Sequence, residues 1–377
     1  MVKASLALTF NDVLLSPGQA GFFRSEISLK TNLTRDIKLD IPLVSSPMDT
    51  VTESELAIAL AKLGGFGFIH RNLTIANQAK EVKKVKSQGL LVGAAVGSSA
   101  GYENRVNALV EAGVDVILID SAHGFSKQVL QALKAIKRKY PKLPVIAGNV
   151  ATAEGAEGLI KAGADGLRVG MGPGAICSTR IISGMGVPQI TAIFGATEVA
   201  RKHNVPVIAD GGIINSGDIT KALAAGASTV MLGRLFAATE ESPGQIVHLK
   251  PEDVPARFRS IIKGEKMYDF KQYRGMGSLA AMKRGIAISS EDEFHGKKYS
   301  GEVLIAEGVE GMVPLHGPLK DIVAQMTGGL QSGMYYVGAK TIPELARKAK
   351  FIQITQASLI ESHPHDLFIT DTGGNLY

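Results

Sequence analysis

The chain has 377 residues, enough for two average domains or one large one. Its residues are 45% apolar and 20% charged, a globular composition that excludes wholesale disorder, and no apolar run is long enough to span a bilayer. Lysines and arginines number 41 against 35 acidic residues, a net charge of +6 that suits an anionic small molecule; without tryptophan or a basic stripe interleaved with aromatics, no specific nucleic-acid binding is expected.

Residues 4–10 form the first apolar stretch, which is too short and too poorly flanked for a signal peptide. We therefore expect a cytoplasmic protein with no membrane segment. Eight short apolar runs follow, and most are apolar on both faces, which is typical of parallel strands buried on both sides. These runs cover residues 41–46, 65–70, 90–97, 114–120, 143–149, 164–170, 205–212 and 227–233.

Amphipathic stretches lie between most of these runs. In 127–139, for example, apolar residues recur at helical spacing while basic residues take the outer face. The predicted helices cover residues 53–63, 75–86, 102–112, 127–139, 153–161, 192–203 and 216–225. Eight strand–helix alternations of about 20–30 residues each fit an α/β fold of the (β/α)8 type, the TIM barrel. An open, doubly wound sheet is the competing architecture.

The residues after 233 are more than one closing helix requires. Within them, the polar stretch 283–300 shows no clear periodicity, and we predict a flap or lid over about 283–306. A C-terminal segment covers 318–377. The prediction is therefore a single barrel domain over 1–377 that carries these two additions.

The loop 170–180 carries the strongest local signal. Its three glycines and one proline allow backbone N–H groups to approach an anion closely, and the loop ends with Cys177, Thr179 and Arg180. Cys177 is the only cysteine, which excludes an internal disulfide and a cysteine-cluster metal site. A lone cysteine is usually a small buried hydrophobic residue, but one at the catalytic face of a barrel is favoured as a nucleophile.

Two further segments point to a ligand. Asp210-Gly211-Gly212 and Gly233-Arg234 end the seventh and eighth strands, the usual phosphate corner of such a barrel, although these glycines could equally serve only tight turns.

Near the C-terminus, His363-Pro-His365 lacks further organised metal ligands, so the residues alone favour a surface turn.

At this point the sequence resembles the IMP dehydrogenase / GMP reductase family nearly from end to end. The segments that carry the resemblance are 10–17, 45–53, 170–180, 209–213, 216–219, 239–244, 273–278, 307–311 and 361–365. Segments 239–244 and 273–282 are closer to the dehydrogenases. The regulatory nucleotide-binding module that many dehydrogenases insert after the second strand is absent, since 87–90 leads straight into the third strand.

The resemblance implies a reaction in which IMP, NAD and water give XMP and NADH through a covalent thioimidate on Cys177, as part of guanine nucleotide biosynthesis. Thr179 and Glu307 would handle the proton transfers. The substrate would be bound by Met48, Ala175, Asp210, Gly212, Gly233, Arg234, Tyr273, Gly275, Met276, Gly277 and Glu307. The residues on the nicotinamide side would be Asp120, Ser121, Asn149 and Gly170.

The resemblance also implies a monovalent cation, K⁺ in this family, and a homotetramer. The cation would lie among the carbonyl groups of Gly170, Gly172 and Cys177, together with Glu361, Ser362 and His363 of a neighbouring subunit. That assignment replaces the surface turn favoured above for the C-terminal segment.

Three positions depart from the family pattern. Ala175 stands where serine is usual, and Arg234 stands where a small residue is usual. The flap reads Ser290 to Tyr299 without the Arg-Tyr pair that activates water in the dehydrogenases; Lys298-Tyr299 is the nearest substitute, and a lysine of ordinary pKa is a poor base at neutral pH. A GMP reductase, which converts GMP and NADPH to IMP and ammonia with the same three catalytic residues, is therefore the alternative. A nucleotide-binding pseudoenzyme is a weaker one.

Overall fold

Eight parallel strands form the central sheet in the computed structural model, which describes residues 5–291 and 304–367. In chain order they are β4 (Leu43–Ser45), β5 (Phe68–Ile69), β6 (Gly93–Val96), β7 (Val116–Asp120), β8 (Val145–Val150), β9 (Gly166–Val169), β10 (Val207–Asp210) and β11 (Thr229–Leu232). The sheet runs β4-β11-β10-β9-β8-β7-β6-β5, and a parallel bridge between Val44 and Phe66 joins its two ends. This closure confirms the barrel over the open sheet.

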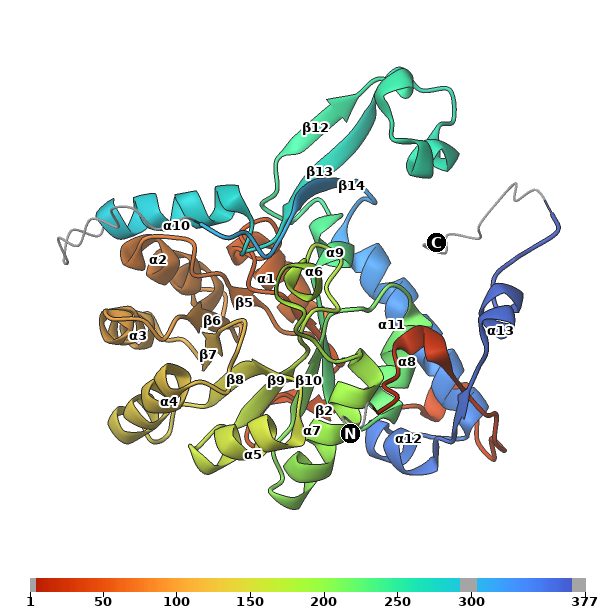
Figure 1. The fold of residues 1–377 in the computed structure, drawn as a ribbon, viewed down its shortest axis with the longest axis horizontal. Coiled ribbons are helices and arrows are strands. Elements are labelled where there is room, and N and C mark those ends of the chain that lie inside the picture. The colour runs from red at the N-terminus through yellow and green to blue at the C-terminus, as the bar shows by residue number, and fades with distance from the viewer. Residues whose placement is uncertain (1–4, 292–303, 368–377) are drawn as a thin grey trace.

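Helices surround the strands (Figure 1). They are α1 (Ser54–Lys62), α2 (Ile75–Lys86), α3 (Tyr102–Glu111), α4 (Lys127–Lys139), α5 (Ala153–Lys161), α7 (Gln189–Lys202), α8 (Ser216–Ala224) and α11 (Leu319–Val337). The first seven match the predicted helices within a few residues. In α4, Val129, Leu133 and Ile136 are buried, and the Ser126 hydroxyl caps the first turn by accepting a hydrogen bond from the Val129 amide.

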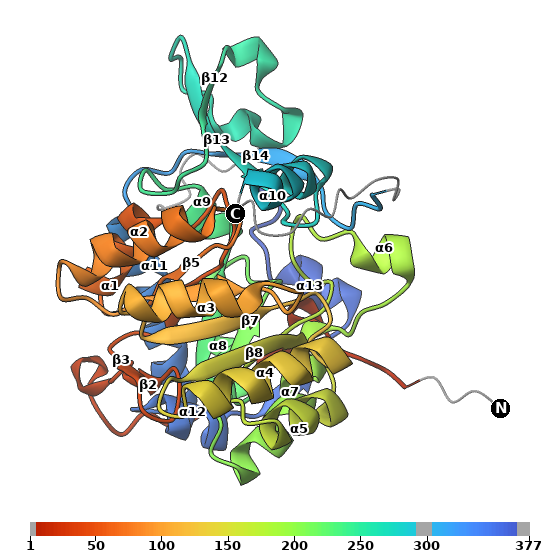
Figure 2. The ribbon, with the colours of Figure 1, turned by 90° about the vertical axis from the view of Figure 1, so that its left-hand side faces the viewer.

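The apolar core has two layers. Strand residues that face inward, including Val44, Phe68, Leu118 and Ile146, fill the barrel interior. The opposite faces of the strands pack against the helices. The hairpin β2 (Thr31–Asn32) and β3 (Lys38–Leu39) lies at the end of the barrel away from β12 to β14 (Figure 2). It contributes Leu33 and Leu39 to the inner layer and closes this end of the barrel. A functional site is therefore expected at the opposite end, where the carboxyl ends of the strands lie.

An excursion interrupts the barrel between β11 and its closing helix α11. It begins with α9 (Arg234–Ala237) and contains an antiparallel sheet of β12 (Ile246–Leu249), β13 (Tyr268–Arg274) and β14 (Glu310–Pro314). This sheet stands above the carboxyl ends of the barrel strands (Figures 1 and 2). It was not predicted from the sequence.

Helix α10 (Leu279–Glu291) also lies in the excursion. We expected irregular structure from residue 283 onward, but residues 283–291 continue this helix. The rest of the predicted flap, from 292 to 303, lies outside the described residues, and so do Lys298 and Tyr299.

The terminal segments pack against the outside of the barrel. Strand β1 (Val13–Leu15) pairs antiparallel with β15 (Phe351–Gln353), which follows α12 (Ile342–Lys348) and precedes α13 (Gln356–Glu361). Among the residues that the structure describes, none of the helices has the length and apolarity needed to cross a membrane.

Candidate active site

The glycine-rich loop 170–178 leaves β9 and leads into α6 (Thr179–Ser183). It starts in contact with the next strand: a Cβ atom on Gly170 would lie 2.0 Å from the carbonyl oxygen of Asp210, and the φ angle of Gly170 is +150°. Only glycine permits this approach. The loop is therefore held against the end of β10, and Cys177 comes to lie at the cavity there.

Three predicted catalytic residues form a hydrogen-bonded row. The Cys177 thiol lies 3.3 Å from the Thr179 hydroxyl, to which it donates, and that hydroxyl donates to a Glu307 carboxylate oxygen at 2.8 Å. Two backbone bonds join the segments that carry these residues: Val309 N–H to the Ile176 carbonyl, and Ser178 N–H to the Glu307 carbonyl. The exposed thiol and the carboxylate thus lie at the two ends of one donor chain.

Asp210 is the centre of a second cluster, below Cys177. One of its carboxylate oxygens accepts hydrogen bonds from the Asn149 amide at 2.7 Å and from Arg168 Nε at 2.9 Å. The Asn149 amide also donates to the Gly170 carbonyl, and the Arg168 guanidinium also donates to Asp120. These contacts connect the residue predicted to bind ribose with those predicted for the nicotinamide side.

Tyr273 lies beside Gly233 at the predicted phosphate end. A Cβ atom on Gly233 would lie 2.9 Å from the Tyr273 hydroxyl, so the strand end and the phenol are in contact. Burial, aided by Asp210, raises the pKa of Tyr273, and the phenol keeps its proton as a hydrogen-bond donor. The half-buried Arg234 is adjacent; among the described residues its guanidinium has no hydrogen-bond or ion-pair partner. A half-buried cation without a partner favours an anionic ligand.

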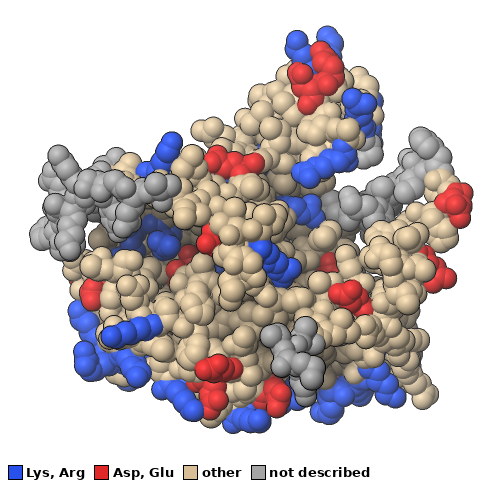
Figure 3. Space-filling view, viewed as in Figure 1, with Lys and Arg blue, Asp and Glu red and all other residues tan. Residues whose placement is uncertain are grey.

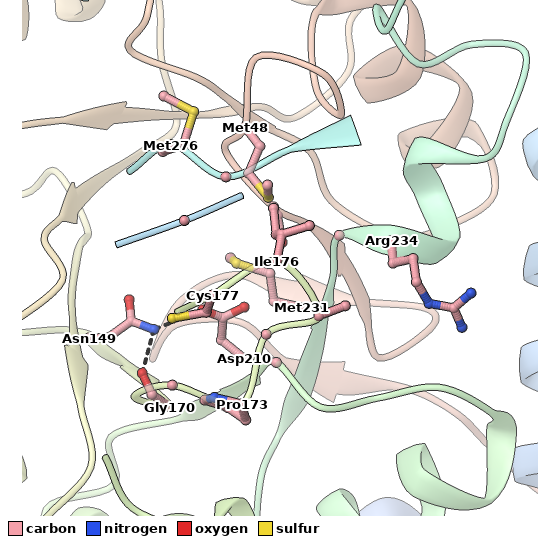
Figure 4. Close-up of a pocket in the computed structure, with 18 of the residues that line it drawn as sticks. Met48, Asn149, Gly170, Pro173, Ile176, Cys177, Asp210, Met231, Arg234 and Met276 are labelled. Atoms are coloured by element: carbon pink, nitrogen blue, oxygen red, sulfur yellow. Dashed lines mark hydrogen bonds between the residues drawn. The ribbon is translucent and has the colours of Figure 1, made fainter. Parts of the chain in front are cut away.

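One cavity of about 430 Å³, a size typical of small-ligand pockets, brings these residues together. Every residue predicted for catalysis, substrate or nicotinamide lines it: Met48, Asp120, Ser121, Asn149, Gly170, Ala175, Cys177, Thr179, Asp210, Gly212, Gly233, Arg234, Tyr273, Gly275, Met276, Gly277 and Glu307. In Figure 4, Cys177, Asn149 and Asp210 lie together, with Met48 and Met276 across the cavity from them. The Arg234 side chain points away from Cys177.

The sequence matches the family described as "IMP dehydrogenase / GMP reductase domain" over residues 7–365. The chain belongs to the IMP dehydrogenase / GMP reductase family. An inosine-5'-monophosphate dehydrogenase of Borreliella burgdorferi is 46% identical and aligns with 96% of this chain and 97% of its own. Enzymes of the same name are 40% identical, from Halalkalibacterium halodurans (98% of this chain, 97% of the relative) and from Aquifex aeolicus (100% and 98%).

Arg168 is the main site residue of this family member that was not predicted from the sequence. Arg168 lies on β9 and is 8% exposed. Burial alone would lower the pKa of Arg168, but the charges of Asp210 and Asp120 hold that pKa above its usual value. The signal was present, since Arg168 lies between Leu167 and Val169 inside the predicted strand 164–170. Arg71, which donates to Asp120 at 3.4 Å, also lines the cavity and was not predicted.

The residues predicted for the cation divide into two groups. Gly170, Gly172 and Cys177 line the cavity, whereas the exposed Glu361, Ser362 and His363 at the end of α13 do not. Among the described residues, no hydrogen bond reaches the carbonyl oxygens of Gly172 or Cys177. Free carbonyl oxygens fit a hard cation such as K⁺. Within the described chain, no cluster of three or more His, Cys, Asp or Glu side chains forms a metal site.

Proposed function

We propose that this protein oxidises IMP to XMP with NAD as the hydride acceptor, as an IMP dehydrogenase of guanine nucleotide synthesis. The observation that carries the proposal is the row from Cys177 through Thr179 to Glu307, at a cavity that collects the predicted nucleotide-binding residues. The relatives described above are named as inosine-5'-monophosphate dehydrogenases, and their alignments with this chain cover nearly their whole lengths.

Cys177 acts as the nucleophile. Its sulfur forms a bond to C2 of the purine, and the hydrogen at C2 departs with both electrons of its bond. When bound, the oxidised nicotinamide nucleotide accepts this hydride. Water then attacks C2 of the thioimidate, one of its protons goes to the departing sulfur, the C2–S bond breaks, and XMP leaves with the thiol restored.

Thr179 and Glu307 move the protons. The thiol donates to the Thr179 hydroxyl and that hydroxyl donates to Glu307, so a proton leaving sulfur has a directed path to a carboxylate. In this proposal both residues lie beside C2 of the purine. They can therefore also transfer a proton to or from the neighbouring N1 atom in later steps.

The rest of the cavity binds the two nucleotides. Asp210 accepts hydrogen bonds from the ribose hydroxyls, while the Tyr273 phenol, Gly212, Gly233 and Arg234 bind the 5′-phosphate. Figure 3 shows Lys and Arg side chains at the surface where the excursion meets the barrel. Asp120, Ser121, Asn149 and Gly170 face the nicotinamide side, in the part of the same cavity that Arg168 and Arg71 line.

A K⁺ ion held by the carbonyls of Gly170, Gly172 and Cys177 would brace the loop that carries the nucleophile. We assign Glu361, Ser362 and His363 of a neighbouring subunit as its other ligands, which requires an oligomer, and we propose the homotetramer that the family resemblance implies. The alignment with the Aquifex relative runs over 503 residues, more than the 377 of this chain. The Aquifex enzyme therefore contains residues that this chain lacks. We infer that they include the regulatory module, because the short segment 87–92 joins α2 to β6 here.

Rapid mixing of the enzyme with IMP and NAD tests the function. Hydride transfer does not need a water-activating base, whereas hydrolysis does, and such a base contributes about 10²–10⁴-fold. Without an Arg-Tyr pair, we expect a burst of NADH near one equivalent per active site and then a slower steady rate. Ammonia release from GMP with NADPH, without a burst from IMP and NAD, would establish the reductase instead.

A further inference from the structure

Arg274 and Asp49 form a buried ion pair next to the cavity. Arg274 Nε lies 3.1 Å from one carboxylate oxygen of Asp49, and an Nη atom lies 2.5 Å from the other. The Asp49 side chain is fully buried, and that of Arg274 is 12% exposed. The pair is thus a two-pronged contact shielded from water, which makes its geometry specific.

Neither partner lines the cavity, but the residues beside them do. Met48 precedes Asp49 in the loop after β4, while Tyr273 and Gly275 flank Arg274 at the end of β13. The two walls meet at Gly233, where an added Cβ atom would lie 2.9 Å from the Tyr273 hydroxyl and 3.5 Å from Met48 Sδ. The ion pair therefore joins the barrel wall that carries Met48 to the wall supplied by the excursion.

Asn72 adds a third connection. Its amide donates to Asp49 at 2.7 Å and to the carbonyl of Ala281 in α10 at 3.3 Å. Although burial opposes ionisation, the hydrogen bonds from Arg274 and Asn72 hold the pKa of Asp49 below its usual value. The carboxylate is charged at neutral pH and bound from two sides.

We propose that the Asp49–Arg274 pair is a positioning element for the purine: it sets the spacing between the Met48 wall and the Tyr273–Gly277 wall. The inference rests on the proposed function, because it takes the purine to lie between these walls. Glu307 depends on the same wall, since its backbone N–H donates to the Gly277 carbonyl at 3.1 Å.

The pair is sensitive to the shape of its cation. A lysine keeps the charge of Arg274 but presents one donor point instead of a planar fork, so it cannot reproduce both contacts. A displacement of about 1 Å at a reacting centre costs about 100-fold in rate. We therefore expect Arg274→Lys and Asp49→Asn to raise the Kd for IMP and to slow the NADH burst.

Lys271 provides a matched control on the same strand. It is 3% exposed, and its ammonium donates to the carbonyl of Ser242 at 2.7 Å, away from the cavity lining. Lys271→Met removes a buried cation from β13 without touching either purine wall. Melting temperature, Kd for IMP, KM for NAD and burst rate are measured for the wild type and for all three variants.

We expect Arg274→Lys and Asp49→Asn each to weaken IMP binding and to slow the burst. In each variant the ratio of burst rate to Kd for IMP should fall by about 10- to 100-fold, while the KM for NAD stays within about twofold of the wild-type value. Lys271→Met lowers the melting temperature but keeps the Kd for IMP. Unchanged IMP binding and burst in folded Arg274→Lys would overturn the proposal. If Asp49→Asn and Arg274→Lys do not fold, Asp49→Glu supplies the test, because it keeps the charge but lengthens the side chain by one methylene group and so changes the spacing between the walls: an unaltered Kd and burst rate would then refute the proposal. A wild type that gives no NADH from IMP refutes the proposed function instead.

Discussion

Arg168 holds Asp210 at 2.9 Å from inside the barrel. Its guanidinium also reaches Asp120, so one buried side chain on β9 connects the ends of β7 and β10. Because Asp210 and Asp120 belong to the proposed ribose and nicotinamide subsites, a change at Arg168 acts on both ligands at once.

Arg168→Met is expected to destabilise the fold and impair binding of both nucleotides. The substitution removes the guanidinium from two largely buried carboxylates, leaving Asp120 only Arg71 and Asp210 only the Asn149 amide, and removing one partner of a buried pair costs about 3–5 kcal/mol. Urea unfolding measures the stability, and separate titrations with IMP and NAD measure the Kd values. A variant that loses affinity for only one of the two nucleotides would contradict the shared role.

Cys177→Ala is expected to abolish NADH formation while IMP still binds. The thiol is the only group in the row that can form the bond to C2, whereas the cavity that binds the nucleotide is retained. A burst assay and a direct IMP titration check the two parts. If the alanine variant produced NADH at a substantial fraction of the wild-type rate, the covalent route would be wrong.

Most of the barrel, and the predicted site residues at its strand ends, were accessible from the pattern of the sequence, whereas Tyr273 and Glu307 on the excursion came only from the family resemblance. Parallel strands buried on both faces give continuous apolar runs, and their carboxyl ends share one face, so the polar residues after each run could be collected into one site. Cys177, Asp210 and Gly233 were found in this way.

The excursion was not accessible in the same way. The strand β13 mixes apolar residues such as Phe270 with polar ones such as Lys271 and Gln272, a weaker signal than a doubly buried apolar run, and its partner β14 begins 36 residues later, at Glu310. Helix α10 is as long as α4 but is only weakly amphipathic, so its apolar residues do not mark one face. The Asp49–Arg274 pair spans 225 residues, and no local pattern can indicate such a contact.

Arg234→Ala is expected to weaken IMP binding by about 10- to 150-fold, because a charge-assisted contact to phosphate contributes about 1.5–3 kcal/mol. Inosine, which lacks the phosphate, should bind the variant and the wild type alike. Calorimetric titration with both ligands provides the comparison. Equal losses for nucleotide and nucleoside would show that Arg234 acts through the fold rather than on phosphate.

Asp49→Asn is expected to make the free energy of unfolding depend less on pH in the acid range. Hydrogen bonds hold the pKa of Asp49 below its ordinary value of about 3.9, so its carboxylate stabilises the fold above that pH, and the stabilisation is lost as the pH falls through the lowered pKa. Urea unfolding between about pH 5 and pH 3 measures this effect. The stability gap between wild type and variant should narrow as the pH falls; a constant gap would argue against the lowered pKa.

The excursion begins and ends at the same point on the barrel rim. His316 N–H donates to the Ala238 carbonyl at 2.8 Å, and Glu240 N–H donates to the Gly317 carbonyl at 3.0 Å, so the chain leaves and re-enters through two paired segments. Such a junction makes the segment in between an interchangeable cassette: it can lengthen, shorten or be exchanged over generations while the eight-stranded frame keeps its dimensions. The cassette carries Tyr273 and Glu307 and the frame carries Cys177 and Asp210, so the cavity is assembled from one part that is free to vary in length and one part that is not.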